Sequence, residues 1–335
     1  MLPGAWLVAT PRQGRAWLPL AAAGVIELTV LVGAGQSFLT GTGRQMLTEE
    51  IEWLAGIETL SDPATSAVPG ARALKIRPEP DSGGAKPRHG SPDGKVAVIT
   101  GAGSGIGRAI AERFHAEGAS IVVADISGNE SAVASSLERA LGVRADVTSS
   151  RDIQAMFDST TARFGGIDIL CNNAGIDGEM HYIADVDEAS FERVMAINLR
   201  GVFLGMKFVI PLLKRRGGGS IINIASTAGI TATPGLGVYG ASKAGVMQLS
   251  RSAAVEYARD GIRVNAVCPA MIATPMVAHL LQTNPQDAAR VLAVTRWAGV
   301  GQPQEVAGVA LFLASDESTY VTGVSLPVDG AYTVL

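Results

Sequence analysis

Three side chains in the second half of the chain combine a hydroxyl, a phenol and an amine at a spacing that suits acid–base chemistry. Ser226 ends the apolar, strand-like run 219–225, and thirteen positions later Tyr239 and Lys243 open a long helical stretch. Residues four apart project from one face of a helix, so the phenol and the ammonium should lie together. The positive charge favours the phenolate and should lower the pKa of Tyr239 from about 10 towards neutrality. Tyr239 could then exchange a proton with an alcohol or carbonyl oxygen, to which Ser226 could also donate.

A glycine-rich turn lies upstream of these groups. The apolar run Val96–Thr100 is followed by Gly101, Gly105 and Gly107 with the spacing G-x-x-x-G-x-G, and a helical pattern begins at once. Strand, glycine loop and helix place free backbone N–H groups at a helix N-terminus, where a phosphate can bind. Glycine lets the phosphate approach the backbone closely. Alone, such a loop could be an ordinary tight turn, but here it accompanies a candidate proton-transfer site.

Together with Thr100 and the run Asn172-Asn173-Ala174-Gly175, these motifs resemble the short-chain dehydrogenase/reductase family in its compact, single-domain form. The resemblance covers about residues 94–335. It implies hydride transfer between a nicotinamide cofactor, NAD rather than NADP, and a secondary alcohol or ketone. The catalytic residues that it implies are Asn198, Ser226, Tyr239 and Lys243. The implied cofactor-binding residues are Gly101, Ser104, Gly105, Ile106, Gly107, Asp125, Ile126, Asp146, Val147, Asn173, Ala174, Gly175, Tyr239, Lys243, Ile272 and Thr274.

The preference for NAD is predicted from Asp125, which follows the strand-like run 120–124 and precedes Ile126-Ser127, with no arginine beside it. An acidic residue about 20 positions past the glycine loop can bind the adenosine ribose hydroxyls. The 2′-phosphate of NADP would meet this carboxylate, and each unit repulsion at about 4 Å costs about 1 kcal/mol in water and about 4 near a protein surface. We expect NAD to be preferred roughly tenfold to several hundredfold. The alternative role for Asp125 is a helix N-cap.

Other implied roles carry structural alternatives. Asp146-Val147 follow a further strand-like run and would lie beside the adenine, although an aspartate there could be a turn residue. Asn173 would approach the cofactor ribose or link neighbouring strand ends. Asn198 lies inside a helical stretch, where asparagine is unfavourable. The resemblance implies that it holds a water molecule that links Lys243 to solvent; the alternative is a satisfied polar residue at a helix bend.

The segment after the run 263–268 is predicted to bind the nicotinamide and the substrate. The resemblance implies that Thr274 holds the carboxamide and that Ile272 offers backbone contacts. Ala270 stands where the family usually has glycine, so its methyl group should narrow the space beside the nicotinamide. Residues 275–300 are expected to be an irregular lid. Its side chains Met276, Val277, Leu280 and Leu281 indicate an apolar substrate or contact with a neighbouring subunit.

Strand-like and helical runs alternate from Lys95 onwards, which predicts an α/β fold with an open, doubly wound parallel sheet, the Rossmann fold. The predicted strands are 96–100, 120–124, 167–172, 219–225, 263–268 and 323–328. The predicted helices lie near 105–117, 150–164, 188–214, 238–259 and 303–314. Ligands of such sheets bind at the carboxyl ends of the strands.

Composition narrows the class of protein. The chain has 335 residues and is 47% hydrophobic, so it can bury a large core. Its net charge is −4, so it lacks the excess of basic residues that is typical of proteins that bind nucleic acid. Cys171 and Cys268 lie in apolar runs and should be buried thiols of a reducing compartment, which favours the cytoplasm. The four histidines are scattered, and no cluster has the spacing of a metal site.

Residues 1–93 differ from the rest. Residues 17–39 are largely apolar but include Glu27, and residues 61–93 are rich in Pro, Gly, Ser and Ala, as flexible linkers are. A charge in the middle of a membrane span is costly, so we expect no membrane insertion. The prediction is an N-terminal extension without an independent fold; a targeting or membrane segment and a small packed appendage are the alternatives.

The resemblance also implies a homotetramer formed through the helix after Tyr239 and the terminal strand, and Gly245, Val246, Leu249, Ala253 and Ala254 would give that helix a close-packing face. The leading hypothesis is an NAD-dependent oxidoreductase for a small apolar alcohol or ketone. One alternative is an NADPH-dependent 3-oxoacyl thioester reductase. The other is a catalytically silent sensor that binds NAD(H).

Overall fold

The structure is a computed structural model that describes residues 91–283 and 299–334, except for the side chains of residues 280, 281 and 283. The predictions for residues 1–90 and for the lid segment 284–298, with the side chains of Leu280 and Leu281, lie outside the described residues. The described part of the chain belongs to one compact unit, Ser82–Leu335.

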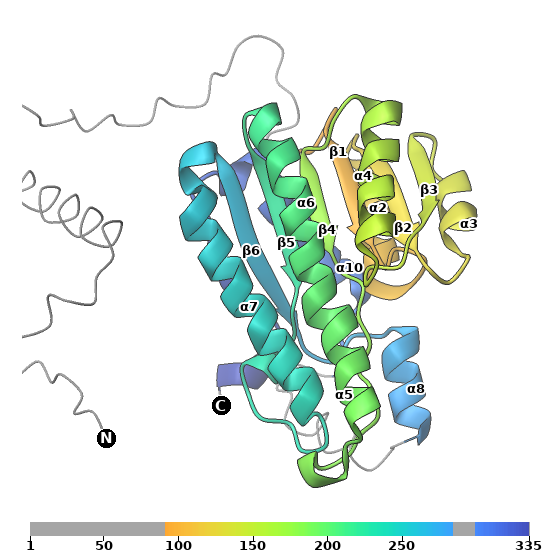
Figure 1. Ribbon diagram of the computed structural model, residues 1–335, viewed down its shortest axis with the longest axis vertical. Helices are drawn as coiled ribbons and strands as arrows, with labels where there is room; N and C mark the ends of the chain where they lie inside the picture. Colours follow the sequence, from red (N-terminus) through yellow and green to blue (C-terminus); the bar gives the residue numbers. More distant parts are fainter. Residues whose placement is uncertain (1–90, 284–298, 335) are drawn as a thin grey trace, which may run out of the picture. The chain divides into compact units, whose positions relative to one another are not determined.

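A parallel sheet of seven strands forms the centre of this unit, in the order β3-β2-β1-β4-β5-β6-β7 (Figure 1). The strands are β1 (Val96–Thr100), β2 (Ser120–Asp125), β3 (Ala140–Arg144), β4 (Ile169–Asn172), β5 (Gly219–Ile224), β6 (Ile262–Pro269) and β7 (Ser325–Val328). The strand order reverses its direction between β1 and β4. The doubly wound sheet predicted from the alternating pattern is therefore confirmed.

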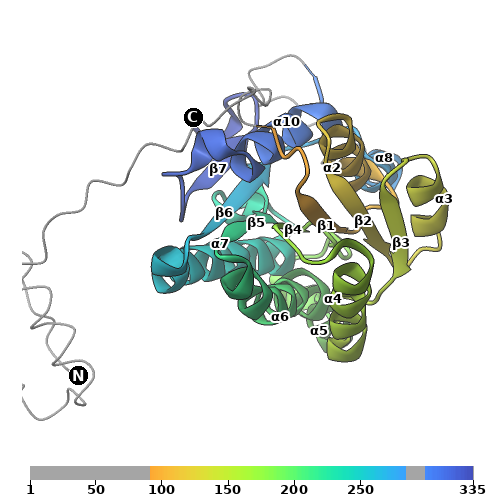
Figure 2. The same ribbon diagram turned by 90° about the horizontal axis from the view of Figure 1, so that it is seen from above.

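Helices cover both faces of the sheet (Figure 2). The helices are α2 (Gly105–Ala116), α3 (Glu130–Ser135), α4 (Ser150–Phe164), α5 (Glu188–Met195), α6 (Gly201–Arg216), α7 (Gly237–Tyr257), α8 (Pro275–Thr283) and α10 (Pro303–Ala314). Helices α4, α6 and α7 lie on one face, and α2 and α10 pack together on the other (Figure 2). The long runs of buried residues in β1, β2 and β4 follow from this double cover.

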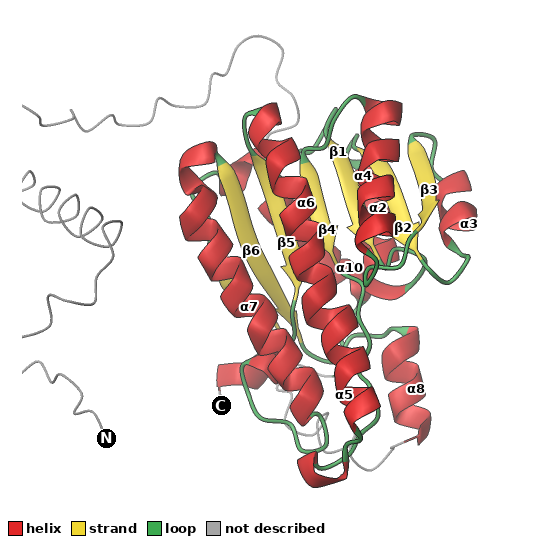
Figure 3. Ribbon diagram, in the orientation of Figure 1, coloured by secondary structure: helices red, strands yellow, loops and turns green. Residues whose placement is uncertain are grey.

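Figure 3 shows the observed elements by type, and they depart from the predicted ones in three places. Helix α3 and the bounds of β3 were not predicted. Residues Pro275–Thr283 form α8, so the prediction of an irregular segment from residue 275 is wrong for this part. The predicted helix 188–214 is interrupted by a π-helical turn, Ala196–Arg200, between α5 and α6.

The two faces of the sheet have separate apolar cores. Val246, Ala253 and Ala254 of α7 are buried in the core beneath α4, α6 and α7. These three side chains pack within their own chain, so they cannot also form the predicted face towards a neighbouring subunit. Cys171 and Cys268 are free and fully buried, as predicted for structural thiols.

One helical stretch among the described residues, Glu188–Arg216, is long and apolar enough to cross a membrane by length and composition. Half of its most apolar window is buried inside the molecule. Val209 and Leu213, for example, lie in the core. Covering the sheet therefore accounts for the apolar character of this stretch.

Candidate active site

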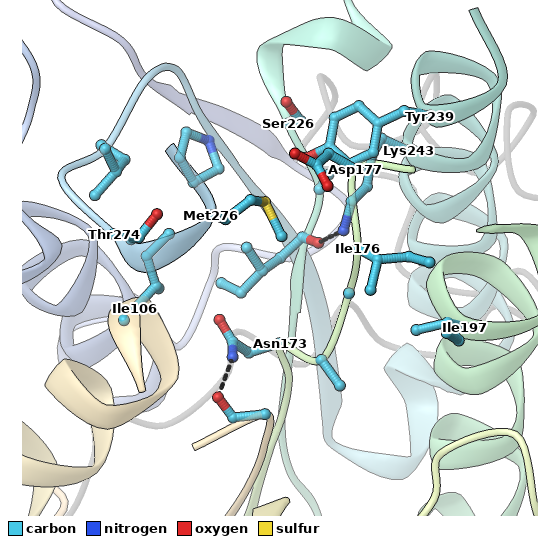
Figure 4. Close-up of a pocket in the computed structure, with 18 of the residues that line it drawn as sticks. Ile106, Asn173, Ile176, Asp177, Ile197, Ser226, Tyr239, Lys243, Thr274 and Met276 are labelled. Carbon is cyan, nitrogen blue, oxygen red and sulfur yellow. Dashed lines mark hydrogen bonds between the residues drawn. The ribbon is translucent and has the colours of Figure 1, made fainter. Parts of the chain in front are cut away.

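A cavity of about 690 Å³ lies at the carboxyl ends of the strands. Its wall is formed by the turn after β1, the segments that follow β2, β4 and β5, the start of α7, and the β6–α8 connection. Ser226, Tyr239 and Lys243 lie together in this wall, and Ile106, Thr274 and Met276 lie across from them (Figure 4). The topology therefore gathers the predicted site from segments far apart in the sequence.

Ser226 is presented by the end of β5. It has extended backbone angles and caps the short 3-10 turn Thr227–Gly229, where its Oγ accepts a hydrogen bond from Ala228 N at 3.1 Å. Only 9% of the residue is exposed. A hydrogen bond from Ser226 favours the phenolate form of Tyr239. The two hydroxyl groups thus converge on one region of the cavity.

Lys243 is 4% exposed and lies on the face of α7 that carries Tyr239. Its Nζ is 5.7 Å from the centre of the Tyr239 ring and donates a hydrogen bond to Ile224 O at 2.9 Å (Figure 4). Burial lowers the pKa of Lys243 from 10.5 to about 8. The carbonyl at the end of β5 therefore holds the amine beneath the phenol.

The pKa of Tyr239 moves opposite to the prediction. Burial of the phenol raises it, the hydrogen bond with Ser226 lowers it, and the negative charge of Asp177 raises it further. Burial disfavours the charged phenolate, and the buried amine of Lys243 is itself easier to deprotonate. The charge of Lys243 was expected to lower the pKa of Tyr239, but it does not outweigh the effects of burial and of Asp177.

Asn198 lies in the π-helical turn and is completely buried. Its Oδ1 accepts from Ile176 N at 2.9 Å, and its Nδ2 donates to Ile176 O at 2.7 Å and to Ser242 Oγ at 3.1 Å. The amide thereby ties the loop after β4 to α7. Gly175 lies between Asn198 and Lys243, since a Cβ there would be 3.2 Å from Asn198 Oδ1 and 3.3 Å from Lys243 Nζ.

The glycine turn after β1 is closely packed. Gly101 has a φ of +65°, which side-chain-bearing residues rarely adopt. A Cβ on Gly107 would lie 2.3 Å from Gly101 O and 2.4 Å from Asn173 Nδ2. Gly107 does not line the cavity, so its glycine is needed for packing of α2 against the turn. Ser104, at the N-cap of α2, makes no side-chain capping bond, and the first turn of α2 has no acidic residue.

Asp125 ends β2 and holds two backbone groups. Its Oδ2 accepts from Gly103 N at 2.8 Å and its Oδ1 accepts from Ser127 N at 2.8 Å. The carboxylate thus braces the glycine turn while it lines the cavity beside the exposed Ile126. Each carboxylate oxygen can accept more than one hydrogen bond, so Asp125 could also accept hydrogen bonds from the ribose hydroxyls, as predicted.

Asn173 and Asp146 have clear structural roles. Asn173 Nδ2 donates to Thr100 O at 2.9 Å and to Gly101 O at 3.0 Å, which joins the ends of β1 and β4. Asp146 Oδ1 accepts from Thr148 N and from Thr148 Oγ1, each at 2.8 Å. Both residues also line the cavity.

The cavity matches the demands of a dinucleotide. The N-terminus of α2 offers backbone N–H groups with no competing carboxylate in its first turn, and glycine there keeps the wall open. From this point the cavity extends to Asp125 and Asp146 on one side and to Ser226 and Tyr239 on the other. These residues fit a pyrophosphate flanked by two nucleosides.

Of the predicted site residues, all but Gly107 and Asn198 line the cavity. The cavity is also lined by residues that were not predicted, among them Asp177 and Tyr332. Asp177 projects towards the region of Tyr239 (Figure 4), and Tyr332 comes from the C-terminal 3-10 turn. Asp329 shapes that turn, since its Oδ2 accepts from Thr333 N at 2.8 Å. Asp177 lies in the loop 176–186, which the family resemblance implies as part of the substrate pocket, but no motif marked this residue within the loop.

Comparisons with known proteins match the part of the chain that forms this site. A family model described as enoyl-(acyl carrier protein) reductase matches residues 101–333. The 2-(R)-hydroxypropyl-CoM dehydrogenase of Xanthobacter autotrophicus is 43% identical over 249 residues, which are 72% of this chain and 99% of that protein. The levodione reductase of Leifsonia aquatica is 42% identical over 248 residues, 70% of this chain and 93% of that protein.

A solved structure gives the same picture in three dimensions. The 3-ketoacyl-(acyl-carrier-protein) reductase from Brucella melitensis, complexed with NADH, superimposes with a TM-score of 0.69 at 34% identity. The match covers 72% of this chain and all of that one.

Proposed function

Because the chain belongs to the short-chain dehydrogenase/reductase family, we propose that it is an oxidoreductase that interconverts a secondary alcohol and a ketone, with NAD as its preferred cofactor. The observation that supports this most directly is the convergence of Ser226, Tyr239 and Lys243 in one cavity beside a phosphate-binding turn. Two relatives are a 2-(R)-hydroxypropyl-CoM dehydrogenase and a levodione reductase.

A bound nicotinamide supplies the hydride acceptor or donor. In the direction of oxidation, the Tyr239 phenolate accepts the hydroxyl proton of the alcohol. The Ser226 hydroxyl donates a hydrogen bond to the same oxygen and holds it beside Tyr239. In the direction of reduction, Tyr239 returns the proton to the carbonyl oxygen.

Lys243 and Asn198 support the proton transfer. When protonated, Lys243 stabilises the phenolate across the 5.7 Å that separates its Nζ from the ring centre. Asn198 acts as a positioning residue, because its amide fixes the backbone of Ile176 next to Gly175. The predicted water molecule between Asn198 and Lys243 would lie next to Gly175, where an added Cβ would be 3.2 Å from Asn198 Oδ1 and 3.3 Å from Lys243 Nζ.

The preference for NAD is supported by Asp125, whose carboxylate lines the cavity beyond the phosphate-binding turn. A 2′-phosphate there would meet a negative charge, at a cost of about 1–4 kcal/mol for each unit charge at about 4 Å. The second candidate is an NADPH-dependent 3-oxoacyl thioester reductase, because the solved relative is a 3-ketoacyl-(acyl-carrier-protein) reductase.

The test is NADH formation by the full chain over a panel of secondary alcohols, run in parallel with NADP. The reverse reaction is followed with ketones and with a 3-oxoacyl thioester. Tyr239→Phe removes the phenolic hydroxyl and should abolish turnover in a protein that still binds NADH. Tyr257→Phe is the matched control, since Tyr257 lies on the same helix but outside the cavity.

The results separate the candidates. The proposal is supported if the unmodified chain and Tyr257→Phe turn over an alcohol with NAD and Tyr239→Phe does not. Turnover only with NADP would contradict the role of Asp125, and selective reduction of the thioester would favour the second candidate. NADH binding without turnover of any compound would favour the silent sensor.

A further inference from the structure

Apart from the reacting groups, the part of the cavity next to Tyr239 is largely apolar. Ile176, Ile197, Leu236, Met271 and Met276 contribute to its wall. Such a wall binds the hydrocarbon part of a substrate and offers few polar partners. A charged side chain in this wall therefore has a large influence on what binds there.

Asp177 is that side chain. It is half-buried in the loop after β4, and its carboxylate lies in the same part of the cavity as Ser226 and Tyr239 (Figure 4). Among the residues that the structure describes, no other side chain donates a hydrogen bond to it. Burial raises its pKa, and the backbone N–H groups of Asp177 and Gly178 and the charge of His279 act in the opposite direction.

The loop is held firmly, so the position of Asp177 is defined. Both backbone polar groups of the preceding residue, Ile176, are bound by the Asn198 amide, at 2.9 and 2.7 Å. Gly178 packs so closely on α5 that a Cβ there would lie 2.8 Å from Val194 Cγ2. The backbone that carries Asp177 is thus fixed relative to Tyr239, which comes from another element.

A half-buried carboxylate without a side-chain donor is favourably placed to accept a hydrogen bond from a ligand, because hydrogen bonds to charged groups are the strong ones. The same charge repels a second anion in surroundings of low dielectric constant. The basic side chains near the site come from other elements: Lys243 from α7, Arg193 from α5 and His279 from α8. Lys243 is already bound to Ile224 O.

We propose that Asp177 determines substrate specificity: it accepts a hydrogen bond from a second donor group, a hydroxyl or an ammonium, on the secondary alcohol, and it excludes alcohols that carry a carboxylate there. This inference rests on the proposed function and deepens it. The substrate class is then a secondary alcohol that is neutral or cationic and has a second hydrogen-bond donor.

The kinetic test compares kcat/KM for cyclohexanol, for the 1,2-, 1,3- and 1,4-cyclohexanediols, and for the corresponding hydroxycyclohexanecarboxylates. The three diols place the second hydroxyl at different positions on the ring, and we expect one of these positions to lie within hydrogen-bonding distance of Asp177. We expect the best diol to exceed cyclohexanol roughly tenfold, as one charged hydrogen bond allows. Asp177→Ala should remove this preference.

Two further variants separate charge from hydrogen bonding and from general effects. Asp177→Asn keeps an acceptor oxygen but removes the charge, so it should retain part of the diol preference and admit the carboxylates. Asp185→Asn removes one charge from an exposed position in the same segment, outside the cavity, and should change none of the ratios.

A binding measurement tests the inference without turnover. The full chain with NADH is titrated with cyclohexylammonium and with cyclohexanecarboxylate, and the fluorescence of NADH reports binding. The ammonium should bind more tightly, and Asp177→Ala should remove the difference. This result in a protein that oxidises no alcohol would show that Asp177 selects ligands with a donor group, but it would reject the proposed function and, with it, the role of Asp177 in alcohol specificity.

Other results overturn the inference. Equal diol-to-cyclohexanol ratios in the unmodified chain and in Asp177→Ala, with normal turnover, would leave the proposed function intact and give Asp177 no role in specificity. Tighter binding of the carboxylate than of the ammonium would likewise contradict the proposal and would direct attention to Arg193.

Discussion

At the residue scale, the buried amine of Lys243 should make the stability of the protein depend on pH. Its pKa is about 8 in the folded protein against 10.5 ordinarily, so the unfolded chain holds more protons between these values and stability should rise with pH there. Lys243→Met removes this dependence. We expect the unmodified protein to gain about 2 kcal/mol of unfolding free energy relative to Lys243→Met between pH 7 and pH 10. Urea unfolding of both proteins at the two pH values measures this difference. Equal changes in unfolding free energy in the two proteins would contradict the burial of the Lys243 amine.

The same residues show what the sequence could reveal of the site. Ser226, Tyr239 and Lys243 were predictable because strand end and helix spacing determine where they project. The direction in which the pKa of Tyr239 shifts was not predictable, because it depends on burial and on the charge of Asp177, and both are produced by the fold. Asp177 itself was missed because no local pattern distinguishes an aspartate in a loop from one that faces a cavity.

At the element scale, the turn before α2 makes a prediction about packing. Gly107→Ala places a Cβ 2.3 Å from Gly101 O, which the closely packed turn cannot relieve without moving. We expect a loss of about 2 kcal/mol of stability and weaker NADH binding. Gly308→Ala is the matched control: Gly308 lies in α10, is exposed, and has nothing within 4 Å of an added Cβ.

The control should gain about 0.5–1 kcal/mol, because alanine is the better helix former, and its NADH affinity should not change. Urea unfolding and NADH fluorescence titrations measure both variants. Equal stability of the two variants would show that the turn can adjust and that Gly107 is dispensable.

Elements were predictable where periodicity was strong, as in α4 and α10. Helix α8 was missed although its start signal is present: Pro275 occupies the first turn, and Thr274 Oγ1 accepts from Val277 N at 3.3 Å. The apolar residues that follow were interpreted as substrate contacts instead of as a helix. The π-helical turn is tied to the contacts of Asn198 with Ile176, which bring together residues 22 positions apart and are not encoded locally.

At the scale of the whole molecule, the predicted domain boundary at residue 94 can be tested against the contacts of the first described residues. Ser91 Oγ donates to Glu117 O, and Pro92 O accepts from Lys95 N at 2.9 Å. Lys95 in turn pairs with Asp316 at 2.6 Å. A chain that begins at residue 94 loses the first two of these contacts.

We predict that a chain beginning at residue 82, the start of the compact unit, binds NADH and unfolds in urea as the full chain does. A chain beginning at residue 94 should be less stable by about 1–2 kcal/mol, because two hydrogen bonds at the N-terminal edge of the sheet are lost. If the chain from residue 82 failed to fold, the first 81 residues would be required for folding of the catalytic domain, and the predicted division into an extension and a separate domain would be wrong. Equal stability of both shortened chains would instead show that the segment 91–93 contributes nothing measurable.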